Sequence, residues 1–426
     1  MSSQERINQR TATPAATTTG GIKDLDLISV VIPTYNHVRF LADAIQSALR
    51  QSYPTVEIIV VDDGSTDNTH TLVESFGERV HYIWQENRGL SGARNTGITA
   101  AQGEYIALLD ADDFWEPTYL ETVHRTLTAD SRLGAVYTGL QFVNSKGERL
   151  PQPCVATVPS DQLYDRLLDG EFFAPSAVLV RQSCFAQVGV FDVTLRASED
   201  WDMWLRVAQV YGFAGIAQPL LNYRVHGSNM SGDPEYMLRY QTMVVRKHFG
   251  APEGDPCQWP APRRRTWAAT CYFAAQGYFL RGDDAKGEAF LRQAFEANPA
   301  LTTQVDLFYE LGCVEQPLGQ RGNPATLNLP KSAERLLRTL NAIFHEPTLA
   351  PQVRNKRRTA FAHAYVALGL LAYNSNQREQ ARAYWFQALR YAPRLAGQRT
   401  FLTRLARTFV KPGLRAALRT LTSPGS

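Results

Sequence analysis

Three short, almost wholly apolar runs near the start of the chain constrain its fold more than any other feature. They are ISVVIP (28–33), VEIIVVD (56–62) and VHYIW (80–84). Runs of this kind are typical of parallel strands that are covered on both faces. The intervening segments, 38–51 and 68–76, carry apolar residues at helical spacing. This order predicts an α/β fold with a doubly wound, mostly parallel sheet, whose ligands bind beyond the carboxyl ends of the strands.

Polar residues follow each of these strands, and a fourth apolar run, EYIALL (104–109), leads into DADD. Any one of these clusters could be a turn or a helix cap. Four clusters on one edge of a sheet instead indicate a binding site. Its predicted members are Asn36, Asp62, Asp63, Asn87, Arg94, Asn95, Asp110, Asp112 and Asp113.

The aspartates of DADD suit a hard divalent cation, because Mg²⁺ and Mn²⁺ prefer oxygen ligands and share them with substrate phosphates. The chain has no GxxxxGK[ST] motif, and GLSGARNTG lacks the GxGxxG spacing, which disfavours an ATPase or a dehydrogenase. A further acidic pair, Glu199 and Asp200, opens a predicted helix. These two residues could simply complement the helix dipole, but beside a metal and diphosphate site they favour group transfer from a nucleoside diphosphate.

Six motifs occur in order between residues 28 and 231: VVIPTYNH, VVDDGSTDNT, ENRGLSGARNTG, LLDADDFW, SEDWDMWLR and YRVHGSNMS. This ordered set resembles the family 2 glycosyltransferases of the GT-A fold. The resemblance implies an inverting enzyme that uses Mn²⁺ or Mg²⁺. It would transfer a sugar from a nucleoside diphosphate, with UDP-sugar favoured, to a hydroxyl of a glycan or lipid-linked acceptor. The expected process is glycan or polysaccharide biosynthesis.

The resemblance also implies a role for individual residues. Asp200 would be the general base, with Glu199 as its catalytic neighbour, and Asp112, Asp110 and His226 would form the metal site. Trp201, Arg224 and Asp113 would contact the acceptor or the diphosphate. The nucleotide would be bound by Pro33, Thr34, Tyr35, Asn36, Asp62, Asp63, Asn87, Arg94, Asp110 and Ala111.

Two other functions share some of these features. A nucleotidyltransferase acting on sugar phosphates would have a similar sheet, but the SED and RVHGSNMS motifs favour the glycosyltransferase. The second alternative is a degenerate, transferase-like scaffold that binds partners through its helices. The presence of Asp110, Asp112, Asp200 and His226 argues against degeneration.

Sequence composition divides the chain into four parts. Residues 1–26 are predicted to be a disordered leader, and 27–234 the GT-A domain. Residues 235–393 are rich in helix formers, and the segments 267–299 and 362–393 resemble tetratricopeptide repeats, which indicates an all-α region that could bind a protein partner. Residues 394–426 form a basic amphipathic tail.

The charge of the C-terminal tail suggests a partner. From residue 380 to 426 there are nine Arg or Lys and no Asp or Glu, interleaved with apolar residues. This pattern favours an anionic membrane surface over nucleic acid, although an ordinary packed helix is an alternative.

The five cysteines are widely spaced and no run of about 18 apolar residues occurs. We therefore expect a cytoplasmic protein, peripheral at the inner face of the membrane.

Overall fold

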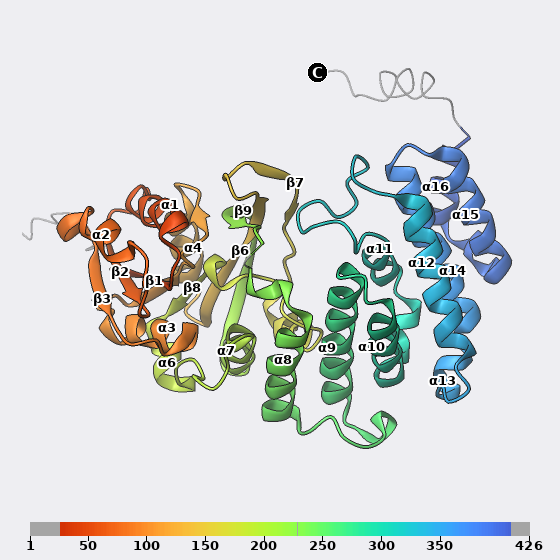
Figure 1. Ribbon diagram of the computed structural model, residues 1–426, viewed down its shortest axis with the longest axis horizontal. Coiled ribbons are helices and arrows are strands. Elements are labelled where there is room, and N and C mark those ends of the chain that lie inside the picture. The colour runs from red at the N-terminus through yellow and green to blue at the C-terminus, as the bar shows by residue number, and fades with distance from the viewer. Residues whose placement is uncertain (1–25, 228, 410–426) are drawn as a thin grey trace, which may run out of the picture.

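A nine-stranded sheet and a following array of helices make up the part of the chain that the structure describes, residues 26–227 and 229–409 (Figure 1). This structure is a computed structural model. The strands lie in the order β3-β2-β1-β4-β8-β6-β9-β5, with β7 paired to β6. Their bounds are β1 Ile28–Thr34, β2 Val56–Asp62, β3 His81–Trp84, β4 Tyr105–Leu108, β5 Phe114–Trp115, β6 Leu133–Val143, β7 Arg149–Cys154, β8 Val178–Arg181 and β9 Gly212–Arg224.

The first four strands form the parallel half of the sheet. β1 lies between β2 and β4, with Val30 opposite Ile58 on one side and Ala107 on the other. Side chains of β1 alternate between two cores, because Ile32 packs with α1 and α4 while Val31 packs with α3 and α7. The carboxyl ends of these strands therefore meet at one edge, as predicted.

The second half of the sheet is mixed. β8 is antiparallel to both β4 and β6, whereas β9 is parallel to β6 and β5 is antiparallel to β9. The predicted α/β class is confirmed, and the parallel pairing extends through β3-β2-β1-β4 and recurs at β6-β9. β6 and β7 are antiparallel neighbours joined by the short turn at residues 144–148.

Helices cover both faces of this sheet, as Figure 1 shows. α7 begins directly after Ser198, which has a left-handed φ of 56°. The bounds are α1 Val38–Leu49, α2 Thr69–Glu74, α3 Gly89–Ala100, α4 Tyr119–Thr128, α5 Leu163–Leu167, α6 Gln182–Val188 and α7 Glu199–Ala208.

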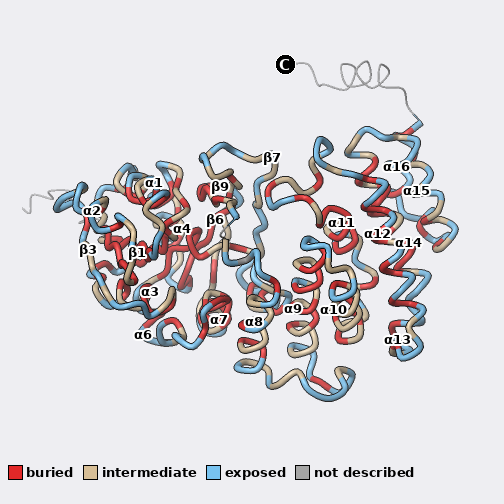
Figure 2. Tube along the Cα trace, in the orientation of Figure 1, coloured by how far each residue is buried: buried red, intermediate tan, exposed pale blue. Residues whose placement is uncertain are grey.

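The rest of the described chain is all-α. The two segments that resemble repeats are helix pairs, α9–α10 and α14–α15, and a continuous buried core joins them to α11 and α12 (Figure 2). The bounds are α8 Pro234–Phe249, α9 Ala261–Leu280, α10 Asp284–Ala297, α11 Val305–Gly312, α12 Leu329–His345, α13 Pro351–Arg354, α14 Arg357–Asn374, α15 Arg378–Tyr391 and α16 Arg399–Arg407.

The sequence predicts a domain boundary between residues 234 and 235. The boundary between the core around the sheet and the core of the all-α part lies elsewhere. Tyr240, Val244 and Val245 of α8 are buried in the same core as α7 and one face of the sheet. α8 therefore belongs to the sheet-containing part by packing, because its apolar face completes that core.

Specific contacts join the two parts. Arg265 of α9 pairs with Asp165 of α5 at 2.6 Å and with Asp169 at 2.7 Å. The backbone N–H of Gln152 in β7 donates to the Gly319 carbonyl, 3.3 Å away, in the loop between α11 and α12. The all-α part is thus braced against both α5 and the β6–β7 hairpin.

Some predicted segments lie outside the described residues. They are the leader up to residue 25 and the tail from residue 410 onward. The earlier part of the basic segment contains α16. Within residues 26–227 and 229–409, no helix combines the length and the apolar character needed to cross a membrane.

Candidate active site

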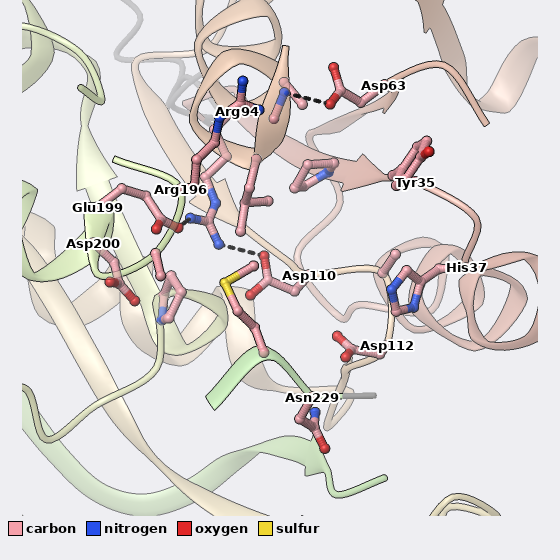
Figure 3. Close-up of a pocket in the computed structure, with 18 of the residues that line it drawn as sticks. Tyr35, His37, Asp63, Arg94, Asp110, Asp112, Arg196, Glu199, Asp200 and Asn229 are labelled. Atoms are coloured by element: carbon pink, nitrogen blue, oxygen red, sulfur yellow. Dashed lines mark hydrogen bonds and ion pairs between the residues drawn. The ribbon is translucent and has the colours of Figure 1, made fainter. Parts of the chain in front are cut away.

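A cleft of about 520 Å³ opens at the carboxyl ends of β1, β2 and β4. The start of α7 and residues 229–237 form its other walls. Figure 3 shows carboxylates reaching into this cleft from several elements, with Asp110 between Asp200 and Asp112 in that view. The predicted meeting of polar strand ends at one edge is therefore observed.

Arg94 is the buried cation of the cleft. It extends from α3, is fully buried, and pairs with Asp110 at 2.6 Å and with Glu199. Its Nε has no hydrogen-bond partner among the described residues. These two carboxylates raise the pKa of Arg94 against the opposing effect of desolvation. The pairing ties the end of β4 to the first turn of α7 and keeps a positive charge in the cleft.

Burial raises the pKa of several carboxyl groups around Arg94. The pKa of Glu199 is raised to about 7, first by desolvation and then by the negative charge of Asp200, while Arg94 opposes the rise. Desolvation also raises the pKa of Asp110, against the lowering effect of Arg94. The pKa of Asp113 is raised well above its usual value by burial and by Asp112. The carboxyl groups near Arg94 thus outnumber the single positive charge that Arg94 provides.

Asp112 and His226 form a second polar pair. The Nε2 atom of His226 lies 3.0 Å from Oδ2 of Asp112. The imidazole stacks on Phe40, with 4.9 Å between the ring centroids, and the Asn229 side chain accepts from the His226 backbone N–H at 2.6 Å. Packing and hydrogen bonding therefore fix the direction of this imidazole, as a metal ligand requires.

Asp63 joins the end of β2 to the start of α3. Its carboxylate accepts from the Gln85 side chain at 2.6 Å and from the backbone N–H groups of Arg88 and Gly89 at 2.9 and 2.8 Å. These bonds hold the carboxylate at the cleft, where Asp63 is one of the lining residues.

Most residues predicted for the site line this cleft. Those that do are Pro33, Thr34, Tyr35, Asp63, Asn87, Arg94, Asp110, Ala111, Asp112, Asp113, Glu199 and Asp200. His226 reaches it through its contact with Asp112. Asn36, Asp62, Trp201 and Arg224 are not lining residues.

Asp62 and Asn36 stabilise loops beside the cleft. Asp62 accepts from the Tyr82 hydroxyl at 2.7 Å and from the Ser65 backbone N–H at 2.8 Å. Asn36, at a left-handed φ of 55°, accepts from the Thr66 backbone N–H at 2.8 Å. Because successive strand side chains alternate, the carboxylate of Asp62 is turned to β3. The nucleotide contact predicted for Asp62 stays a prediction.

Trp201 and Arg224 are buried instead of facing a substrate. Trp201 is 2% exposed and its indole donates to the Leu167 carbonyl at 2.9 Å. Arg224 is 1% exposed and pairs with Asp43 at 2.8 Å, while its Nε donates to the Asp112 carbonyl. Neither side chain lines the cleft, and the acceptor and diphosphate contacts predicted for them stay predictions. Trp201 packs α7, and Arg224 supports the backbone of the DADD segment.

Other lining residues, from loops and from the first turn of α8, were not predicted from the sequence. They include Glu171, Arg196, Asn229, Met230 and Tyr236. Glu171 follows α5, and its exposed side chain lines the cleft. The sequence signals available were that Arg196 precedes the SED motif by two residues and that Asn229 lies within RVHGSNMS.

Comparisons with known proteins relate part of this chain to one family. Residues 29–181 match the family described as glycosyl transferase family 2. An uncharacterised glycosyltransferase of Rickettsia typhi is 34% identical over 209 residues, which are 47% of this chain and 64% of the relative. Chondroitin synthase of Escherichia coli is 30% identical over 216 residues, covering 49% of this chain and 30% of that protein. The chain thus spans less than two thirds of the length of these relatives.

Among solved structures, TarS residues 1–349 of S. aureus, crystallised with UDP-GlcNAc, aligns with a TM-score of 0.45 and 16% identity. The alignment covers 85% of this chain and 90% of that one.

Proposed function

We propose that this protein, whose residues 29–181 match the glycosyl transferase family 2, transfers a sugar from a nucleoside diphosphate to an acceptor hydroxyl. The donor is a UDP-sugar, and the transfer inverts the anomeric centre in one displacement. The observation that carries this proposal is a single cleft in which Asp63, the Asp112–His226 pair and Asp200 are all presented.

The Asp112–His226 pair suits a divalent cation that completes its ligand set with substrate. A carboxylate oxygen and an imidazole nitrogen are acceptable ligands for Mn²⁺ or Mg²⁺. No group of three acidic, His or Cys side chains is placed to hold a metal within residues 26–227 and 229–409. Diphosphate oxygens are therefore expected to supply further ligands. Such an ion, when bound, would offset negative charge on the leaving diphosphate.

Asp110 supports this arrangement through Arg94. One of its oxygens is held by Arg94 at 2.6 Å, so we assign Asp110 to the ribose and to orienting the metal site. Arg94 also contributes positive charge close to the place where the diphosphate would lie.

Asp200 is the proposed general base. Its backbone position at the start of α7 is fixed by Glu199, which pairs with Arg94, and by its own carboxylate, which accepts from the Trp201 backbone N–H at 2.9 Å. An acceptor hydroxyl must lose its proton as it attacks the anomeric carbon, and a carboxylate in the cleft can accept that proton.

The acceptor is proposed to be a growing glycan or a lipid-linked sugar. The all-α part would bind a protein partner, and the basic segment that includes α16 would contact an anionic membrane surface from the cytoplasmic side. In α16, Leu402 and the nearby Phe409 are exposed beside Arg404 and Arg407, which supports the membrane contact.

A donor screen tests the proposed reaction. Purified protein with Mn²⁺ is incubated with a panel of nucleotide sugars, and release of the nucleoside diphosphate is measured. We expect release from a UDP-sugar that exceeds the release without enzyme and falls when EDTA is added. Absence of release from every donor, together with absence of nucleoside diphosphate binding in calorimetry, would contradict the proposal.

A further inference from the structure

Arg196 projects its side chain into the cleft from the segment before α7. The residue is exposed and lines the cleft. Two hydrogen bonds fix its backbone: the Tyr236 hydroxyl donates to the Arg196 carbonyl at 3.2 Å, and the buried Ser91 hydroxyl of α3 donates to the Leu195 carbonyl at 2.8 Å. The start of this side chain is therefore held in place by α3 and α8.

The guanidinium of Arg196 packs against Gly89, the first residue of α3. A Cβ added to Gly89 would overlap Nη1 and lie 3.1 Å from Cζ. The backbone N–H of the same Gly89 donates to Oδ2 of Asp63 at 2.8 Å. Figure 3 shows the Arg196 side chain extending toward the Asp63 end of the cleft, away from Asp112. Gly89 thus contacts both the guanidinium of Arg196 and the carboxylate of Asp63.

The charge of Arg196 is available to a ligand. No carboxylate lies within ion-pair distance of its guanidinium in the described part of the chain, whereas the guanidinium of Arg94 is shared by two carboxylates. Asp63 retains acceptor capacity as well. Its carboxylate has about four acceptor positions, and three hydrogen bonds use three of them.

The Arg196 guanidinium can donate a hydrogen bond and the Asp63 carboxylate beside it can accept one. This combination matches one kind of nucleobase edge. Uracil and guanine present a ring N–H next to a carbonyl oxygen. Cytosine and adenine present a ring nitrogen acceptor next to an amino group, so both contacts would be mismatched. A buried polar group left without its partner discriminates strongly between such ligands.

We propose that Arg196 determines base specificity: it donates to the carbonyl of an imide-type base, uracil or guanine, while Asp63 accepts from the adjacent ring N–H. This inference rests on the proposed function, since it concerns the nucleotide of the same donor. Arg196 thereby gains a role in choosing the donor, and cytidine and adenosine diphosphate sugars are excluded as donors.

Calorimetry with four nucleotides tests the proposal. The full chain is titrated with UDP, GDP, CDP and ADP in the presence of Mn²⁺, so that the diphosphate is constant and only the base differs. The variants are Arg196→Met, which removes the donor, and Arg196→Lys, which keeps the charge but shortens the reach of the donor. Arg50→Met is the matched control, because Arg50 is on α1 and bonds to Gln46 outside the cleft.

The expected result depends on the base. Wild-type protein should bind UDP or GDP more tightly than CDP and ADP. Arg196→Met should weaken the preferred nucleotide by about tenfold, as expected for loss of a hydrogen bond to a charged donor, and leave CDP and ADP within about twofold. Arg196→Lys should retain part of the preference, and Arg50→Met all of it.

Two other outcomes overturn the inference alone: equal weakening of all four nucleotides, which would place Arg196 on the diphosphate or ribose, or no change in any of them. If wild-type protein bound none of the four, the proposed function would fail and this inference with it.

Discussion

At the scale of single residues, Arg94 is central because it neutralises two carboxylates in a buried setting. Its side chain is 1% exposed, and its partners Asp110 and Glu199 belong to β4's carboxyl end and to α7. Removing the cation would leave both carboxylates without their opposite charge. Removing one partner of a buried ion pair lowers the free energy of unfolding by far more than the intact pair contributes to it.

We expect Arg94→Met to lower the free energy of unfolding by about 3–5 kcal/mol at pH 8. Urea unfolding followed by circular dichroism measures this change. The control is Arg149→Met, since Arg149 pairs with Glu116 at 2.7 Å but is mostly exposed, and little change is expected there. Equal effects of the two variants would contradict the structural role of Arg94.

The raised pKa of Glu199 predicts a pH dependence of stability. Its pKa is about 7 in the folded protein, against an ordinary value of 4.5. The folded state therefore holds this proton more tightly than the unfolded state, and the associated stability is lost as pH rises from about 4.5 to about 7. In Glu199→Gln, the decrease in unfolding free energy between pH 5 and pH 8 should be smaller than in wild type. A decrease of the same size in both proteins would contradict the assignment.

Sequence predicted the strand-end residues of the site better than its loop residues. Asp63 and Asp110 could be found because parallel strands bring their carboxyl ends together. Asp62, the neighbour of Asp63, points to β3 instead, because side chains alternate along β2. Trp201 was assigned by its place beside Asp200, although helical spacing puts it with Trp204 and Leu205 on the buried side of α7.

At the scale of elements, the helix pair α14–α15 depends on close contact at Gly369. A Cβ added there would overlap the indole of Trp385, which is 1% exposed and donates to the Val366 carbonyl at 3.2 Å. Alanine is the better helix former at an open position, by about 1 kcal/mol. At this position the close packing of the indole outweighs that preference.

Gly369→Ala should therefore destabilise the protein by about 1–3 kcal/mol, the usual cost of overpacking. Thermal unfolding of the full chain measures the effect. Gly397→Ala is the control, because a Cβ at Gly397 would meet no atom within 4 Å, and it should change stability little. A stabilised Gly369→Ala variant would show that the α14–α15 contact is looser than described.

Apolar periodicity located these elements because it depends on local spacing. The strands 28–34 and 56–62 and the two helix pairs lie where the pattern put them. The antiparallel insertion of β8 beside β4, and the packing of α8 on the sheet-containing part, depend on contacts distant in sequence. No local pattern carries that information, so these features required the structure.

At the scale of the whole molecule, the all-α part is positioned to affect the cleft. Arg265 of α9 binds Asp165 and Asp169, and Glu171 enters the cleft two residues later. Arg281, the residue directly after α9, donates to the Gly232 carbonyl at 3.0 Å, and Gly232 lies two residues after the cleft residue Met230. α9 and the residue that follows it therefore contact two segments that carry lining residues of the cleft.

Arg265→Ala should loosen the α5 segment, because two ion pairs to it are lost. Hydrogen exchange in residues 163–174 should become faster, while global stability falls by about 1 kcal/mol or less, as expected for partly exposed pairs. Arg264→Ala, on the same helix, is the control and should leave exchange in this segment unchanged. Unaltered exchange in Arg265→Ala would show that the brace does not order the cleft wall.

The most direct test of the account is the Asp200→Asn variant of the full chain, assayed with the donor identified by the screen. Loss of the general base should reduce sugar transfer by about 10²–10⁴-fold. Binding of the nucleoside diphosphate with Mn²⁺ should stay within about twofold of wild type, because Asp63, Asp112 and His226 are unchanged. Full transfer activity in Asp200→Asn would contradict the assignment of this cleft residue as the base.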